Sequence, residues 1–355
     1  MANARLPNST QAHPTRRAFA IGSGVAAALA GSAIAARPAR ASGLDAELIA
    51  GALEAGEAMD QMRALVIARD GVELEAHRFR GPSLDAPVNI KSASKTVMAA
   101  LAGVAIDRGV LESVEQTISP AFADLISENA DARVHDITVE DLITMRTGLE
   151  RTSGRNYGAW VVSNNWTENA LNRPFVDEPG GRMLYSTGSY HILSALLTRA
   201  SGRSTLALAR DWLGGPLDIE IPPWTRDPQG VYLGGNEMAM SPRALVKLGE
   251  LYRLGGVYGG DRVLPETWIQ ASWTARTRSP FSRDQYGYGW FIDRAGGRRV
   301  YYARGYGGQM VYVVPDLELT VAMTSDPNAP GRGGHVEKLN RLLANAIIPA
   351  AERGA

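Results

Sequence analysis

The sequence predicts a mixed α/β fold of the α+β type, in which an antiparallel sheet from both chain ends is covered by helices and a helical subdomain is inserted. Strand-like patterns occur soon after the start of the fold and again near its end, and a mostly helical pattern fills the stretch between them. We therefore expect a sheet domain of residues 42–110 and 240–355, a helical subdomain of residues 111–239, and an export signal over residues 1–41.

The sheet domain begins with an amphipathic helix over residues 44–62. Two strands follow at Ala64–Arg69 and Glu73–Phe79. Asp70-Gly71 lies between these two apolar runs, which predicts a tight hairpin. A second helix begins within NIKSASKTVMAALAGVAIDRG (residues 89–109) and is apolar on nearly every side, as is typical of a buried helix.

Three further helices are predicted from their end signals. The first runs to Gly148 and has Thr138 as its N-cap. The second covers residues 189–200 and ends at Ser201-Gly202. The third covers residues 241–255, with a proline at its first helical position.

The C-terminal part is rich in strands and closes with a helix over residues 336–348. Glycine and proline pairs mark two of the turns between the strands. The predicted strands are Tyr288–Asp293, Arg298–Ala303, Gln309–Val314 and Glu318–Met323.

The first 41 residues have the pattern of an export signal. Thr15-Arg16-Arg17-Ala18-Phe19 is typical of a twin-arginine motif, a chargeless stretch follows, and Ala39-Arg40-Ala41 fits a cleavage site. The alternative is a membrane anchor, but the stretch consists mostly of Ala and Gly, which disfavours a stable span. We expect a periplasmic protein without a stable membrane span once the signal is removed.

Composition excludes several classes of function. The 37 Lys and Arg balance the 37 Asp and Glu, and no basic run is long enough for a nucleic-acid footprint. The chain has no Cys, so disulfides, thiolate chemistry and cysteine-ligated metals are excluded. The five His are scattered and form no HExxH motif. We expect neither a metal nor another cofactor.

Ser92-Ala93-Ser94-Lys95 is the first candidate catalytic motif. Residues three apart share a helix face, so the Lys95 amine meets the Ser92 hydroxyl. Burial lowers a lysine pKa, and a neutral amine can take the proton of a serine nucleophile. Only four of the 37 basic residues are Lys, and Arg could not act as this base. The alternative is a lysine whose stem is buried and whose amine reaches solvent.

Two other segments are candidate parts of the site. Tyr185 follows a Pro-Gly-Gly turn just before a helix, and a tyrosine beside a lysine can transfer protons. Arg304-Gly305-Tyr306-Gly307-Gly308-Gln309 lies between two strands, where glycine can mark close approach of a ligand. A structural tyrosine and an ordinary glycine-rich turn are the alternatives.

Together, in this order, the three motifs resemble those of serine β-lactamase-like and penicillin-binding-protein-like hydrolases. The branch most similar to this chain holds class C β-lactamases, β-lactamase-like carboxylesterases and 6-aminohexanoate-dimer hydrolases. The resemblance covers nearly all of the chain after the signal and implies the β-lactamase/transpeptidase-like fold. The matching segments are ITVEDLITMRTGL (137–149), EPGGRMLYSTGSYHILSALLTRASG (178–202), MSPRALVKLGELYRLGGVYGGDRVLPETWI (240–269) and YGYGWF (286–291).

The resemblance implies roles for single residues. Ser92 would be the nucleophile, Lys95 its base partner and Tyr185 a second proton-transfer group. The backbone N–H groups of Ser92 and Tyr306 would bind the oxyanion. We assign the remaining substrate-binding positions to Gly305, Gly307 and Thr187.

Two departures from the family pattern bear on the substrate. Thr187 stands where the family often has Asn, and Ala303 stands where β-lactamases carry a cationic partner for the substrate carboxylate. Arg304 is adjacent, but we expect its side chain on the other face of the strand. Both departures favour an ester or amide substrate over a β-lactam.

We therefore expect an exported serine hydrolase of the carboxylesterase or amidase type that acts on a small-molecule ester or amide. The alternatives are β-lactamase or D-Ala-D-Ala peptidase activity, and a non-catalytic member of the fold that binds peptidoglycan or protein. Glu168-Asn169-Ala170-Leu171-Asn172 matches a class A β-lactamase signature, but the motifs that should accompany it are absent, so we interpret it as a chance match.

Overall fold

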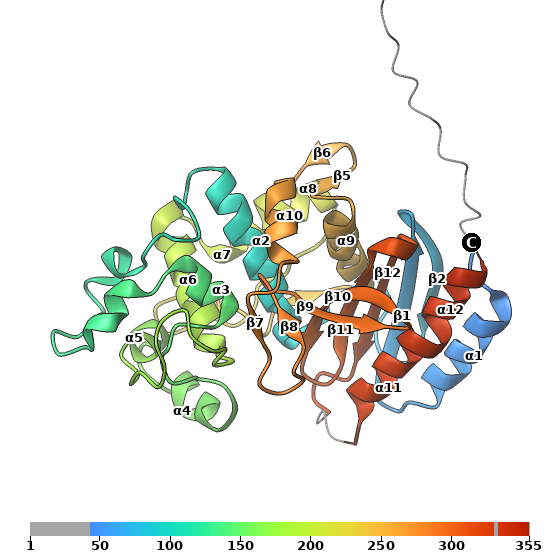
Figure 1. The fold of residues 1–355 in the computed structure, drawn as a ribbon, viewed down its shortest axis with the longest axis horizontal. Coiled ribbons are helices and arrows are strands. Elements are labelled where there is room, and N and C mark those ends of the chain that lie inside the picture. Colours follow the sequence, from blue (N-terminus) through green and yellow to red (C-terminus); the bar gives the residue numbers. More distant parts are fainter. Residues whose placement is uncertain (1–42, 330–332, 355) are drawn as a thin grey trace, which may run out of the picture. The chain divides into compact units, whose positions relative to one another are not determined.

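Strands from both ends of the chain form the main sheet, as predicted. The computed structural model describes residues 43–329 and 333–354, so the predicted export signal lies outside the described residues. The sheet is antiparallel, has eight strands in the order β2-β1-β12-β11-β10-β9-β8-β7 and is shown in Figure 1. Its strands are β1 (Met62–Arg69), β2 (Val72–Arg78), β7 (Thr277–Arg278), β8 (Gln285–Tyr286), β9 (Phe291–Ala295), β10 (Arg298–Gly305), β11 (Gln309–Val314) and β12 (Leu319–Ser325).

The helices lie on both faces of this sheet and in the segment between its two halves (Figure 1). They are α1 (Ala46–Glu57), α2 (Ser94–Asp107), α3 (Val139–Thr144), α4 (Tyr157–Val161), α5 (Trp166–Leu171), α6 (Thr187–Ser201), α7 (Thr205–Ala209), α8 (Gly215–Leu217), α9 (Pro242–Arg253), α10 (Glu266–Ser272), α11 (His335–Leu342) and α12 (Ile348–Arg353). Two small antiparallel pairs lie outside the main sheet: β3 (Val88–Asn89) with β4 (Ala239–Met240), and β5 (Val257–Tyr258) with β6 (Asp261–Arg262).

The central strands are covered on both faces. Every residue of β11 and β12 is buried, so these strands do not alternate between a core face and a solvent face. Gly249 of α9 packs closely on Val311 and Val313, while the Tyr312 hydroxyl between them donates to Asn340 of α11, 2.7 Å away. Successive side chains of β11 therefore contact α9 on one face and α11 on the other.

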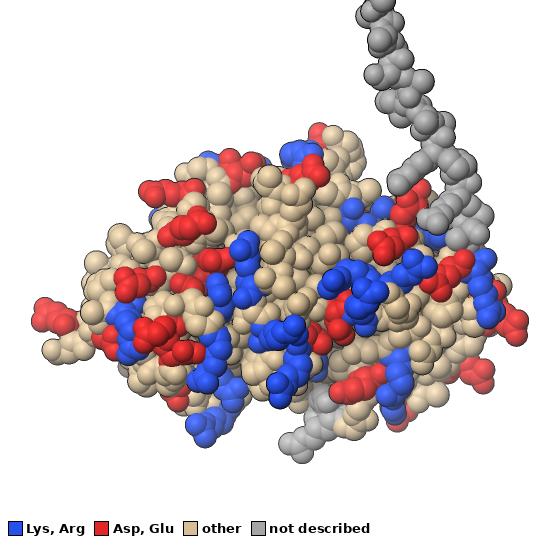
Figure 2. Space-filling view, viewed as in Figure 1, with Lys and Arg blue, Asp and Glu red and all other residues tan. Residues whose placement is uncertain are grey.

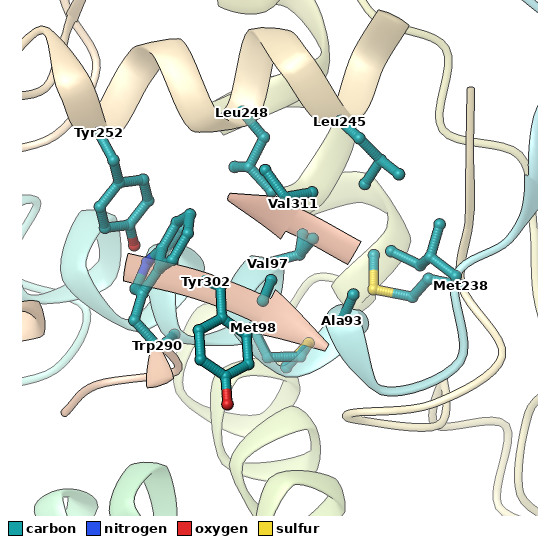
Figure 3. Packing of buried hydrophobic residues seen from close by; sticks show 14 of the residues in the cluster. Ala93, Val97, Met98, Met238, Leu245, Leu248, Tyr252, Trp290, Tyr302 and Val311 are labelled. Carbon is teal, nitrogen blue, oxygen red and sulfur yellow. The ribbon is translucent and has the colours of Figure 1, made fainter. Parts of the chain in front are cut away.

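The core next to the candidate site joins α2, α9 and the sheet. Figure 3 shows Leu245 and Leu248 of α9 next to Val311 of the sheet, with Val97 and Met98 of α2 on the side of the cluster away from α9. All five side chains are buried. This packing fixes α2, and with it the residues at its N-terminus, against the sheet.

Several predicted ends are confirmed by local geometry. Asp70 and Gly71 both have positive φ values, 48° and 77°, as a two-residue hairpin of this kind requires. Thr138 and Asp141 form a reciprocal capping box at the start of α3. Gly202 ends α6 in the left-handed conformation, at φ 66°.

Other boundaries differ from the prediction. The first helix ends at Glu57, because Met62 already begins β1. Helix α3 ends at Thr144, because Met145 adopts a left-handed conformation at φ 57°. The last helix continues through a π-helical turn (Leu343–Ile347) into α12. Strands β7 and β8 were not predicted, since two residues are too few to display an alternating pattern.

The face shown in Figure 2 has no continuous band of side chains of one charge, because basic and acidic side chains are interspersed on it. Many of them form ion pairs, such as Arg199 with Asp124 and Arg243 with Glu73. Within residues 43–329 and 333–354, no helix is long and apolar enough to cross a membrane.

Candidate active site

Ser92 lies in a 3₁₀ turn (Lys91–Ala93) that leads directly into α2. The backbone of Lys91 is left-handed, at φ 55°, and its N–H donates to the Asn89 side chain, 2.8 Å away. This turn leaves Ser92 partly exposed, while Ser94 and Lys95 are buried. The nucleophile candidate therefore projects from the end of a helix that is otherwise enclosed.

The Lys95 amine lies close to Ser92. Its Nζ is 2.7 Å from the Gly235 carbonyl oxygen and 3.4 Å from both Ser92 Oγ and Thr187 Oγ1. Burial lowers the pKa of Lys95 from 10.5 to about 7. At neutral pH a substantial fraction of this amine is therefore unprotonated and able to accept the serine proton.

Tyr185 stands over the same amine. Its ring centroid is 4.9 Å from Lys95 Nζ. Burial raises the pKa of the Tyr185 phenol, while a hydrogen bond with the Ser92 hydroxyl and the charge of Arg304 lower it. Helix α6 begins two residues later at Thr187, whose backbone N–H donates to Ser153 Oγ at 2.8 Å. The start of α6 is thereby fixed beside Ser92.

The turn after β10 completes the surroundings of Ser92. A Cβ at Gly305 would lie 2.1 Å from the Ile90 carbonyl oxygen, so only glycine lets this strand end approach the Ser92 turn so closely. The neighbouring Tyr306 is 57% exposed. Together these elements enclose a cavity of about 240 Å³ lined by Ser92, Tyr185, Ser279, Phe281, Ser282, Phe291, Arg304, Gly305 and Tyr306.

The family assignment follows from a family model described as Beta-lactamase, which matches residues 55–346. The chain belongs to the beta-lactamase family. The comparison with curated proteins found no significant match.

Solved structures share the fold of this beta-lactamase family protein at low identity. One is provisionally named a 6-aminohexanoate-dimer hydrolase, from Bacillus anthracis, with 17% identity, coverage of 83% of this chain and 80% of that one, and a TM-score of 0.67. An octameric penicillin-binding protein homologue from Pyrococcus abyssi has 16% identity, coverage of 87% and 78%, and a TM-score of 0.68. EstCE1, described as a hydrolase with promiscuous acyltransferase activity, has 15% identity, coverage of 84% and 97%, and a TM-score of 0.67.

Two of the predicted substrate-binding residues do not line the cavity. Thr187 is buried behind Ser92, where its hydroxyl contacts Lys95 and Ser153. Gly307 lies in the turn at φ 78° and packs against the Asp326 carbonyl oxygen. Both residues therefore lie outside the lining of the cavity that Ser92 borders.

The expectation that the Arg304 side chain faces away from the site was wrong. This side chain and that of Ala303 do alternate, but Ala303 is the one buried in the core, and Arg304 lines the cavity with Ser92. Across the described part of the chain, the guanidinium of Arg304 has no hydrogen bond and no ion pair. The cavity thus holds an unpaired guanidinium that the sequence prediction had assigned to the opposite face.

Sequence reasoning missed several features of the site, among them Ser153, the Gly235 carbonyl and Phe281. Phe281 is 65% exposed at the mouth of the cavity, where its ring packs on Tyr185 at a centroid distance of 5.9 Å. The Gly234-Gly235 pair was the available signal for a close backbone approach. Glu168, from the signature interpreted as a chance match, lines a different hollow.

Proposed function

We propose that this protein is an exported serine hydrolase that cleaves an ester or amide bond through an acyl-enzyme on Ser92. One observation carries the proposal: the buried Lys95 amine, with its pKa lowered to about 7, lies 3.4 Å from Ser92 Oγ and beneath the Tyr185 ring. A protein that only binds peptidoglycan or another protein has no need of a deprotonatable amine against a serine.

Acylation follows from this arrangement. Ser92 Oγ forms a bond to the substrate carbonyl carbon as its proton passes to the neutral Lys95 amine. The carbonyl oxygen becomes an oxyanion, which we assign to the backbone N–H groups of Ser92 and Tyr306. The bond to the leaving alcohol or amine then breaks, and the departing atom receives a proton through Tyr185 from Lys95, whose amine becomes neutral again.

Deacylation uses the same groups. A water molecule gives a proton to the Lys95 and Tyr185 pair as its oxygen attacks the acyl carbon. The proton returns to Ser92 Oγ when the ester bond breaks, and the free acid leaves. No step requires a cofactor.

Labelling by a fluorophosphonate tests the proposal. We expect one adduct per chain, located at Ser92 by intact-mass and peptide mass spectrometry. The labelling rate should rise as pH increases through about 7, because Lys95 must lose its proton before it can accept one from Ser92. Labelling at another residue, or a rate that does not change between pH 5.5 and 8.5, would contradict the assignment.

Arg304 favours a second candidate, a β-lactamase or D-Ala-D-Ala peptidase activity. The substrates of both activities carry a carboxylate near the scissile amide. An unpaired guanidinium on the wall of the cavity is a suitable partner for such a group. The absence of a cation at Ala303 therefore does not weigh against these substrates.

Replacing Arg304 with glutamine separates the two candidates. A hydrogen bond to a charged group contributes about 1.5–3 kcal/mol. If a substrate carboxylate binds Arg304, R304Q should lower kcat/KM for nitrocefin by about ten- to hundred-fold, and for p-nitrophenyl butyrate by much less. R298Q, at the other end of β10, is the matched control. Equal losses on both substrates would exclude Arg304 as a carboxylate partner.

Export through the twin-arginine route is also part of the proposal, and the Arg16-Arg17 pair supports it. Changing both residues to lysine should leave the full-length precursor in the cytoplasm, because this route depends on the arginine pair. Fractionation followed by intact-mass measurement reads out the result. Normal periplasmic delivery of the double variant would rule out this route.

A further inference from the structure

The shortest polar contact of Lys95 is made with a backbone atom, the Gly235 carbonyl oxygen, at 2.7 Å. The loop that carries this carbonyl is packed tightly on its neighbours. A Cβ at Gly234 would lie 1.9 Å from the Tyr190 carbonyl oxygen, and one at Gly235 would lie 2.9 Å from Lys95 Cγ. The position of the amine therefore depends on where this glycine pair is held.

A buried histidine and aspartate hold the glycine pair from behind. His191 of α6 and Asp227 are fully enclosed, and His191 Nε2 is 3.0 Å from Asp227 Oδ2. On the other side of the imidazole ring, the Gly234 N–H donates to His191 Nδ1 at 3.4 Å. The second carboxylate oxygen, Asp227 Oδ1, accepts the backbone N–H groups of Gln229 and Val231.

These contacts determine which tautomer the histidine adopts. Nδ1 faces a donor and must be unprotonated, so the ring proton is on Nε2 and points to the carboxylate. A carboxylate that orients a histidine in this way controls both its tautomer and its direction. The contacts thus run without a break from Asp227 through His191 and the Gly234–Gly235 backbone to the Lys95 amine.

We propose that Asp227 and His191 are positioning residues for catalysis, which hold the Gly235 carbonyl where it aligns Lys95 with Ser92. This inference rests on the proposed function, because it gives the pair a role through the catalytic lysine. Neither side chain reaches the cavity that Ser92 lines. Their effect should therefore fall on the chemical step and leave substrate binding nearly unchanged.

The isosteric variant D227N tests the tautomer. The two backbone donors at Oδ1 keep the amide oxygen there, so the amide NH₂ must face His191 Nε2. The ring proton then moves to Nδ1, where it meets the Gly234 N–H, and two donors oppose each other. We expect kcat to fall by about ten- to hundred-fold, as for a misplacement of about 1 Å, while KM changes by less than about threefold.

A second pair of variants separates positioning from packing. The amide of asparagine at position 191 lies near the place of Nδ1, so its oxygen can accept from the Gly234 N–H. The amide of glutamine lies near the place of Nε2, so it can donate to Asp227 but leaves the Gly234 N–H without an acceptor. Both variants remove the ring that packs on Trp160 and Trp166, and asparagine leaves the larger cavity, so packing alone predicts a loss in H191N at least as large as in H191Q. We expect H191N to retain within about fivefold of the wild-type kcat and H191Q to lose about ten- to hundred-fold.

The measurements are kcat and KM on a p-nitrophenyl ester, the rate of fluorophosphonate labelling at Ser92, and the melting temperature. Nitrogen-15 NMR of histidine-labelled protein should show His191 protonated at Nε2 in the wild type and at Nδ1 in D227N. Folded D227N with wild-type kcat, or a loss in H191N at least as large as in H191Q, would overturn the inference. Failure of the wild type itself to label at Ser92 would instead overturn the proposed function.

Discussion

Replacing Ser92 with alanine is expected to abolish turnover of p-nitrophenyl esters, with a loss of about 10⁴-fold or more in kcat. Removing Oγ removes the atom that carries the acyl group in the proposed mechanism. Ser279 and Ser282 also line the cavity, but neither forms a hydrogen bond with the Lys95 amine, as the Ser92 hydroxyl does. Steady-state kinetics with fluorophosphonate labelling measures the effect.

The matched control is S94A, two residues further along the chain at the start of α2. Ser94 is fully buried, and its hydroxyl donates to the Lys91 carbonyl oxygen. S94A should therefore lower the melting temperature while most of the activity remains. If S92A keeps more than about a tenth of the wild-type kcat, a nucleophile other than Ser92 must be forming the acyl-enzyme.

Features determined by local chemistry could be predicted from the sequence. The Asp70-Gly71 hairpin, the Thr138 cap and the glycine that ends α6 each depend on residues only a few positions apart. The Ser92 and Lys95 pair belongs to the same class, because helix geometry alone brings side chains three residues apart together.

Features that depend on distant parts of the chain could not be predicted. The Gly235 carbonyl, which accepts a hydrogen bond from the Lys95 amine, is 140 residues away from Lys95 in the sequence. Ser153 reaches Thr187 across 34 residues. No periodicity encodes such contacts, because they arise when separate elements pack together. The glycine pair indicated a close approach, but the sequence did not identify the element that it approaches.

Arg304 illustrates a prediction that was half right. Strand alternation correctly puts Ala303 and Arg304 on opposite faces. Which of the two faces borders the cavity depends on how the loop bearing Ser279 and Phe281 folds over the strand end, and the sequence pattern carries no signal for that. β-Lactamases carry a cationic residue at the position of Ala303, whereas the cation that lines the cavity in this chain is Arg304.

Lys95 offers the sharpest test of the mechanism, because two substitutions separate its charge from its basicity. Methionine fills a similar volume without charge, whereas arginine keeps a positive charge and cannot be deprotonated. If Lys95 acts as the base, both K95M and K95R should lower kcat/KM by about 10²- to 10⁴-fold. If only its charge were needed, K95R would retain activity and K95M would not.

The two variants should also differ in stability and in pH dependence. Lys95 is buried beside the Gly235 carbonyl, so a permanent charge in K95R should lower the melting temperature more than K95M does. K247M, which removes a partly exposed lysine of α9, is the control for substitution alone. In K95M the residual labelling of Ser92 should no longer rise through pH 7, because the group that titrates there has been removed. A rise that persists in K95M would mean that another residue accepts the serine proton.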